Sequence, residues 1–148
     1  MRRLIHDLKF HADFPCARLL GMLMAEYIVG LPRQPECVIP VPLHPSRYRE
    51  RGFNQAIEIA RHVAKRTEIR LDLNACVRTR PTPPQSMLSA KERRTNLRHA
   101  FEVVKPPAVR RIALIDDVIT TGATVNELAT ALKQTGIEHV DVWACARA

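Results

Sequence analysis

Residues 112–124 read IALIDDVITTGAT, and this stretch decides the fold. Four apolar residues run directly into the adjacent acids Asp116 and Asp117. A short, unbroken apolar run of this kind predicts a strand buried in a parallel sheet, here Arg111–Asp116. After a predicted loop at 117–122, residues 123–135 keep the three-and-four apolar spacing of a helix, and Gly136 closes it.

The turn between this strand and this helix carries groups that bind phosphate. Ligands of open parallel sheets bind at the carboxyl ends of the strands, and the first N–H groups of a helix are unpaired donors at its positive end. The hydroxyls of Thr120, Thr121 and Thr124 add further donors. Gly122 lets the backbone, including Ala123, approach a ligand closely. We therefore expect a phosphate site at residues 120–124.

The two carboxylates need a different ligand group, because they would repel a phosphate. Asp116 and Asp117 suit sugar hydroxyls, or a Mg²⁺ ion held directly or through water. A phosphate beside vicinal hydroxyls describes ribose 5-phosphate. A structural role also fits, since Thr124-Val-Asn-Glu127 has the pattern of a capping box and aspartates are ordinary at strand ends.

The rest of the chain alternates predicted helices with short strands. This alternation predicts an α/β fold with a mainly parallel central sheet flanked by helices, in a single domain covering residues 1–148. The segments 43–55 and 79–88 are predicted loops. The further predicted helices are 1–10, 15–29, 54–66 and 89–99, and the further predicted strands are 37–42, 71–78, 101–104 and 139–147.

Composition limits the partners and the compartment. The net charge of +8, from 23 basic and 15 acidic residues, indicates an anionic partner, either nucleic acid or a phosphorylated small molecule, or else only a basic solvated surface. The four cysteines form no C-x-x-C pair, which favours buried, reduced thiols over a zinc site. The uncharged run 19–25 is too short to span a bilayer and no secretory signal is visible, so we expect a cytoplasmic protein without a membrane contact.

The basic loop 43–55 is the second candidate anion site. Arg51–Gly52 lets a guanidinium and a bare backbone approach a ligand together, and Asn54–Gln55 offers amide donors at a helix start. A solvated basic loop is the alternative, and Arg47 and Arg49 fit it well.

Three stretches in order resemble a known family. IALIDDVITTGAT is similar to the phosphoribosyl-pyrophosphate signature of type I phosphoribosyltransferases. IPVPLHPSRYRERGFNQA (39–56) and QSMLSAKERRTNLRHAF (85–101) resemble the other two marks of the ComF family, phosphoribosyltransferase-like proteins associated with competence for DNA uptake. Many members carry an N-terminal zinc ribbon with paired cysteines, and this sequence shows none.

The resemblance implies a type I phosphoribosyltransferase fold with residues in named roles. Asp116 and Asp117 are implied to be the catalytic pair and the Mg²⁺ ligands, and the loop after the first strand is implied to hold pyrophosphate. The stretch 85–98 resembles a flexible hood whose basic residues, with Arg94 as the expected substrate contact, close over the site. An exposed helix face fits that stretch equally. His44 and His99 receive no catalytic role.

Three functional hypotheses follow. The first is a Mg²⁺-dependent phosphoribosyltransferase that uses 5-phosphoribosyl 1-pyrophosphate, with an acceptor that the sequence does not identify. The second is a non-catalytic module that binds a phosphoribosylated ligand or interacts with competence proteins of the DNA-uptake machinery. The third is direct binding of single-stranded DNA, which the aromatic content of 5% supports poorly because such sites stack bases on aromatic rings.

Overall fold

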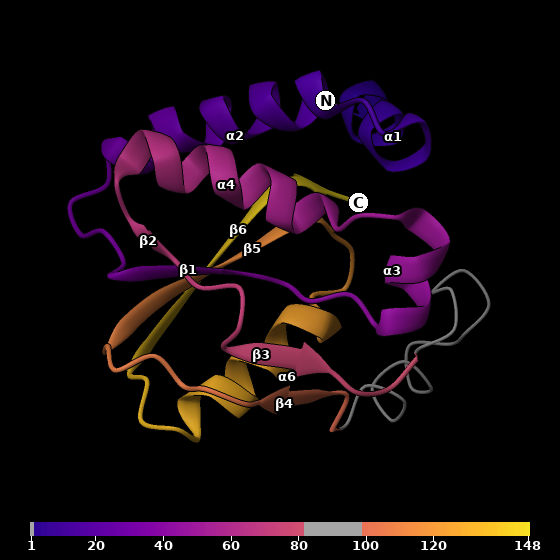
Figure 1. Ribbon diagram of the computed structural model, residues 1–148. Helices are drawn as coiled ribbons and strands as arrows, with labels where there is room; N and C mark the ends of the chain where they lie inside the picture. Colours follow the sequence, from indigo (N-terminus) through magenta and orange to yellow (C-terminus); the bar gives the residue numbers. More distant parts are fainter. Residues whose placement is uncertain (1, 82–98) are drawn as a thin grey trace.

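A computed structural model describes residues 2–81 and 99–148 and shows a four-stranded parallel sheet at the centre (Figure 1). The strand order is β2-β1-β5-β6. A separate antiparallel pair, β3 with β4, lies beside it. The strands of the main sheet are β2 (Arg70–Leu71), β1 (Cys37–Pro40), β5 (Arg111–Ile119) and β6 (His139–Arg147), and those of the pair are β3 (Cys76–Arg78) and β4 (Phe101–Val103).

Helices cover both faces of the main sheet and bury one core on each. On one face lie α1 (Arg2–His11), α2 (Phe14–Val29) and α4 (Gln55–Thr67), and on the other lie α6 (Ala123–Lys133) and the β3–β4 pair (Figure 1). Because side chains alternate along a strand, β5 sends residues 113 and 115 into the first core and residues 112 and 114 into the second. This arrangement confirms the predicted α/β fold with a parallel sheet flanked by helices.

Strand β5 is longer than expected, and the difference places both acids inside it. Asp116 pairs with Ala144, and Ile119 pairs with Arg147, because β6 continues beside β5 as far as that point. The prediction of a loop from residue 117 is therefore wrong, and the loop begins at 120. On the other side β1 ends at Pro40, so among the described residues no strand pairs with β5 on that edge beyond Ile115.

The predicted loop 43–55 contains a short helix, α3 (Pro45–Arg51), so that prediction is wrong as well. His44 caps the helix, since its Nδ1 accepts a hydrogen bond from the backbone N–H of Ser46 at 3.2 Å. Pro45 fits the first turn, and Gly52 ends the helix with a φ of 84°, a conformation that favours glycine.

The single strand predicted at 71–78 is in fact two strands in two different sheets. The carboxylate of Asp72 accepts a hydrogen bond from the backbone N–H of Asn74 at 3.0 Å, and this turn ends β2 before β3 begins. The other helices and strands predicted within the described ranges are present. The helix predicted at 89–99 falls almost wholly on residues 82–98, outside the described residues.

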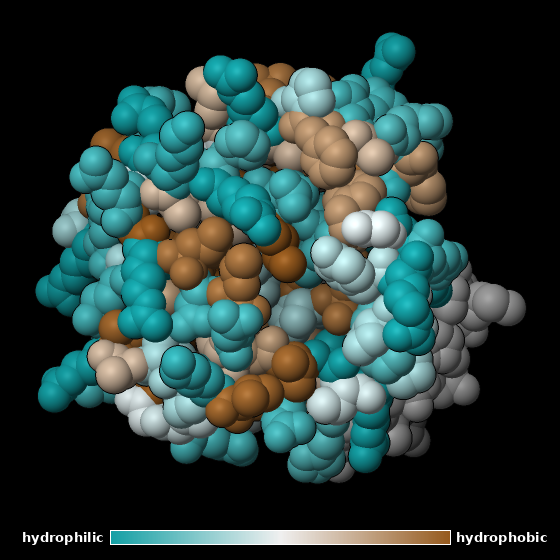
Figure 2. All heavy atoms as spheres, viewed as in Figure 1, coloured by the Kyte–Doolittle hydropathy of each residue, from teal (hydrophilic) through white to brown (hydrophobic). Residues whose placement is uncertain are grey.

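All four cysteines lie in the described ranges and carry free thiols. Cys16, Cys37 and Cys76 are buried, Cys145 is half-buried, and none forms a disulfide. Within residues 2–81 and 99–148, no helix combines the length and the apolar character needed to cross a bilayer. Hydrophilic side chains dominate the face seen in Figure 2, with apolar groups gathered between them.

Candidate functional site

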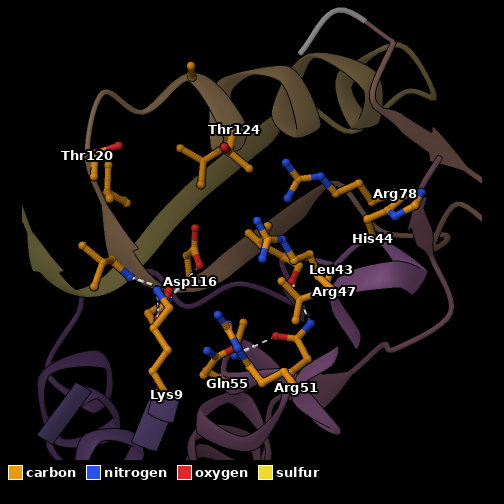
Figure 3. Close-up of a pocket in the computed structure, with 18 of the residues that line it drawn as sticks. Lys9, Leu43, His44, Arg47, Arg51, Gln55, Arg78, Asp116, Thr120 and Thr124 are labelled. Atoms are coloured by element: carbon orange, nitrogen blue, oxygen red, sulfur yellow. Dashed lines mark hydrogen bonds and ion pairs between the residues drawn. The ribbon is translucent and has the colours of Figure 1, made fainter. Parts of the chain in front are cut away.

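A cavity of about 530 Å³ lies where β1 and β5 end, at the carboxyl edge of the parallel sheet. Its wall combines residues from α1, the β1–α4 connection, β3, the end of β5 and the start of α6. Figure 3 shows Thr120 and Thr124 on one side of Asp116, with Arg51 and Gln55 on the other. The polar and charged residues of the wall are Lys9, His44, Arg47, Arg51, Asn54, Gln55, Arg78, Asp116, Asp117, Thr120 and Thr124.

The two acids occupy successive positions of β5, and both line the cavity, with their side chains close enough to interact. Asp117 is buried, with 9% of its surface exposed. Its Oδ1 accepts a hydrogen bond from the backbone N–H of Val118 at 2.9 Å. Its Oδ2 lies 3.3 Å from the ammonium of Lys9, yet makes no hydrogen bond. The Lys9 contact is thus a charge contact, and Oδ2 keeps its capacity to accept a hydrogen bond from a ligand.

The pKa of Asp116 lies well above the ordinary value for an aspartate. Burial is the main cause that raises its pKa to about 7, and the negative charge of Asp117 raises it further, while the charge of Lys9 opposes the shift. Its Oδ1 accepts a hydrogen bond from the backbone N–H of Asp117 at 2.9 Å. Near neutral pH, Asp116 can therefore bind either as a hydrogen-bond donor or, when a cation approaches, as a carboxylate.

The turn before α6 is the predicted phosphate site. Gly122 is the N-cap with a φ of 77° and has no side chain with which to cap the helix. The hydroxyl of Thr121 accepts a hydrogen bond from the backbone N–H of Ala123 at 3.4 Å. Thr120, Gly122, Ala123 and Thr124 line the cavity, whereas Thr121 does not.

The capping box suggested for residues 124–127 does not form. Gly122, rather than Thr124, occupies the N-cap position of α6. The carboxylate of Glu127 instead accepts a hydrogen bond from the backbone N–H of His99 at 2.8 Å. Thr124 therefore faces the cavity with a hydroxyl that is not needed for capping (Figure 3).

Helix α3 carries two arginines into the cavity. Arg47 and Arg51 line it, while Arg49 and Gly52 do not. Burial lowers the pKa of Arg51, and the negative charge of Asp117 opposes that shift. Because α3 is a helix, residues four positions apart share a face, and this spacing selects 47 and 51 over 49.

The start of α4 contributes two side-chain amides, of which one is hydrogen-bonded within the protein and the other has an unpaired NH₂ group. Asn54 donates from Nδ2 to the carbonyl of Val41 at 3.0 Å and accepts at Oδ1 from the N–H of Ala56 at 2.9 Å, so it caps the helix. Gln55 is equally buried, with 3% exposed, but its Nε2 has no hydrogen-bond partner. A buried donor left unpaired costs stability, and a ligand acceptor in the cavity would satisfy it.

Sequence reasoning missed several cavity residues because they come from distant elements. Lys9 and Phe10 come from α1, and Arg78 comes from β3. Burial lowers the pKa of Arg78, and the charge of Asp116 opposes the shift. His44 also lines the cavity, beside its capping role. Arg94, the expected substrate contact of the hood, lies outside the described residues.

The charges of the described wall favour an anionic ligand. The wall carries two acids and four basic side chains, which are Lys9, Arg47, Arg51 and Arg78. With its pKa raised to about 7, Asp116 is partly protonated at neutral pH. The acids offer the oxygen atoms that Mg²⁺ prefers, and the free acceptor Oδ2 of Asp117 fits either a metal ion or a sugar hydroxyl. The wall thus combines anion-binding and hydroxyl- or metal-binding groups within one cavity.

Comparisons of the sequence with known proteins identify relatives of this chain. No sequence-family model matches the chain. The chain is 39% identical to Competence protein F of Haemophilus influenzae, across 98% of this chain and 67% of the relative. It is also 39% identical to DNA utilization protein YhgH of Escherichia coli O6:H1, across 97% of this chain and 66% of the relative. The chain therefore spans about two thirds of the length of these curated relatives.

A solved structure supports the fold. The protein TT1426 from Thermus thermophilus matches with a TM-score of 0.52 at 18% identity, across 89% of this chain and 83% of that one. This likeness concerns the fold alone. Because 98% of this chain aligns with Competence protein F at 39% identity, the chain belongs to the ComF family of competence proteins.

Proposed function

We propose that the cavity binds 5-phosphoribosyl 1-pyrophosphate together with Mg²⁺ and transfers the phosphoribosyl group to an acceptor. The observation that carries this proposal is Asp117 Oδ2, a buried acceptor without a hydrogen bond in the same cavity as the Gly122 turn. A ligand with a phosphate at one end and hydroxyls a few bonds away satisfies both features at once.

Each part of the substrate has a matching part of the wall. The 5-phosphate binds at the start of α6, where the N-cap Gly122 carries no side chain and the positive end of the helix faces the cavity. The ribose hydroxyls bind Asp116 and Asp117. The pyrophosphate binds Arg51 and the unpaired amide of Gln55.

Catalysis in this proposal rests on positioning and charge. As the bond from C1 to the pyrophosphate oxygen breaks, positive charge grows on the sugar, and Asp117 stabilises it. The arginines of α3 stabilise the negative charge of the departing pyrophosphate. Bound Mg²⁺, held by the two acids, would supply further neutralisation of the pyrophosphate charge.

Calorimetric titration with phosphoribosyl pyrophosphate and Mg²⁺ tests this function. We expect the double variant Asp116→Asn, Asp117→Asn to bind roughly tenfold or more weakly, because hydrogen bonds to charged groups contribute about 1.5–3 kcal/mol. The control is Asp141→Asn, which removes a carboxylate of β6 that pairs with Arg111 at 3.5 Å, outside the cavity wall. Equal affinity of the double variant and the wild type would contradict the proposal.

A second function is favoured by the names of the relatives, which refer to competence and DNA utilization and name no transfer reaction. In this case the chain binds the same ligand without turnover and acts as an interaction module of DNA uptake. Release of pyrophosphate distinguishes the two functions. Tight binding without release, across all acceptors tried and with folded protein, favours the module.

A further inference from the structure

The last two turns of α1 carry a cluster of metal-ligating side chains outside the cavity. His6, Asp7 and His11 each offer one ligand atom, and these three atoms lie within 4.8 Å of one another. None of the three is among the described residues that line the cavity. This α1 cluster is therefore separate from the two acids of β5.

The end of the helix brings the three side chains together. Asp7 and His11 are four positions apart and share one face of α1. A helical side chain leans toward the N-terminus of its helix, so His11 leans back over the preceding turn. The ring centroids of His11 and His6 lie 5.7 Å apart, and Nδ1 of His6 lies 3.6 Å from Oδ1 of Asp7. Ala12 follows with a φ of 51°, which ends the helix at His11.

The ligand atoms of the α1 cluster are not used elsewhere in the described part of the protein. The described residues make no hydrogen bond with the ring nitrogens of His6 or His11, and both side chains are exposed. The carboxylate of Asp7 makes charge contacts with His6 and with Nε of Arg3 at 3.8 Å. Because the Arg3 side chain is 95% exposed, its contact is weak. A metal ion at this place would displace no buried interaction.

The ligand types select a transition metal over Mg²⁺. Imidazole suits Zn²⁺, Ni²⁺ and Cu²⁺, whereas Mg²⁺ takes oxygen ligands. Zinc bonds to nitrogen and oxygen are about 2.0–2.2 Å long, so tetrahedral ligands lie roughly 3.4 Å apart. The exposed imidazoles can close to that separation by rotation about their side-chain bonds. The negative end of the α1 dipole, at His11, also favours a bound cation.

We propose that His6, Asp7 and His11 bind one Zn²⁺ ion, with both imidazoles neutral and the carboxylate ionised. Three protein ligands leave a fourth position for water. Lys9 lies between the ligand residues in sequence, reaches from the same helix into the cavity (Figure 3) and contacts Asp117 at 3.3 Å. The bound ion therefore fixes the helical turn that supplies a wall residue of the cavity. This site does not depend on the proposed transfer reaction.

Calorimetric titration with Zn²⁺, without phosphoribosyl pyrophosphate, tests the site. We expect one ion per chain, no competition from excess Mg²⁺, and weaker binding at about pH 5.5 than at about pH 7.5, because the histidines bind only when neutral. His6→Ala and His11→Ala should each weaken binding roughly tenfold or more, since loss of even an outer-shell partner costs about 10–100-fold. The matched control is His139→Ala, an exposed histidine of β6 outside the cluster, which should bind as wild type.

Thermal melting gives a second measurement. A ligand that binds only the folded chain raises the melting temperature. Zn²⁺ should therefore raise that of the wild type and of His139→Ala, and raise it less for the double variant His6→Ala, His11→Ala. Because both positions are exposed, we expect the double variant to fold, and its far-ultraviolet circular dichroism should match that of the wild type.

Two results would overturn the proposal. The first is the absence of binding by the folded wild type with Zn²⁺ in excess over protein. The second is unchanged affinity of the double variant, which would place the ion elsewhere, at the free thiols or at the two acids of β5. Neither result bears on the proposed function, since these titrations contain no phosphoribosyl pyrophosphate. Failure of the wild type to bind phosphoribosyl pyrophosphate with Mg²⁺ would remove the proposed function and leave the zinc site intact.

Discussion

The two halves of β5 differ although they belong to one strand. Residues 112–115 are fully buried, and β1 and β6 pair with them on both edges. Residues 116–119 carry both acids and border the cavity, and 116, 118 and 119 pair with β6, the one strand beside them in the described part of the chain. The change occurs where β1 ends at Pro40. The first four of these residues belong to the core and the next four border the cavity, because the neighbouring strand β1 ends between them.

The largest expected effect is in the buried half. Leu114→Ala removes a side chain with no exposed surface from the core against α6, and we expect a loss of about 3 kcal/mol in the free energy of unfolding. Urea denaturation measures it. The control Val142→Ala, at an exposed position of β6, should cost less than about 1 kcal/mol. A similar cost at both positions would show that residue 114 is not part of a packed core.

A smaller, pH-dependent effect is expected in the open half. The folded chain keeps the Asp116 proton up to a pKa of about 7, whereas the unfolded chain loses it near the ordinary value of 3.8. The folded state therefore binds more protons between these values, and the contribution of Asp116 to stability falls as pH rises through this window and then levels off.

Asp116→Asn lacks this penalty and should melt several degrees higher than wild type at pH 8, with the difference disappearing near pH 4. Thermal melts at the two pH values measure it, and groups that titrate equally in both proteins cancel. An equal difference at both pH values would mean that the pKa of Asp116 is not raised in the folded state.

The smallest effect concerns the turn that follows β5. Gly122→Ala forces an L side chain to adopt a φ of 77°, although only Asn126 lies within 4 Å of the new Cβ, at 3.7 Å. We expect a cost of roughly 1 kcal/mol from backbone strain. Gly136→Ala imposes similar strain at a φ of 99° away from the cavity.

The pair of glycine variants separates strain from function. Chemical denaturation should show similar losses for both, while calorimetry should show weaker binding of phosphoribosyl pyrophosphate for Gly122→Ala alone. Equal affinities would indicate that the turn before α6 does not bind the phosphate.

Elements with a clear apolar period could be predicted from the sequence, and those without one could not. Helix α4 and strand β6 were predictable because their apolar residues repeat at helical and strand spacing. Helix α3 (PSRYRER) has no buried residue, so periodicity gave no signal, although Pro45 and Gly52 marked its ends. Residues 71–78 were predicted as one strand because apolar residues recur along them. The turn at Asp72–Asn74 divides them into β2 and β3, and its signal in the sequence is weak.

The site was predictable where its residues are adjacent in sequence. Asp116, Asp117 and the Gly122 turn lie within one motif and line one cavity. Lys9 and Arg78 reach the cavity only because α1 and β3 pack near the ends of β1 and β5, and no local pattern reports such packing. The end of β5 was misplaced because its length depends on β6, which follows later in the chain.

The strand order also has a consequence for folding during synthesis. Cys37 in β1 pairs with Arg70 in β2 on one edge and with Ile112 in β5 on the other, so the second edge of β1 stays unpaired until β5 has left the ribosome. Pairings between such distant positions form slowly and leave apolar surface uncovered meanwhile. The two sides of the cavity are therefore brought together only late in synthesis, after residue 115 has emerged.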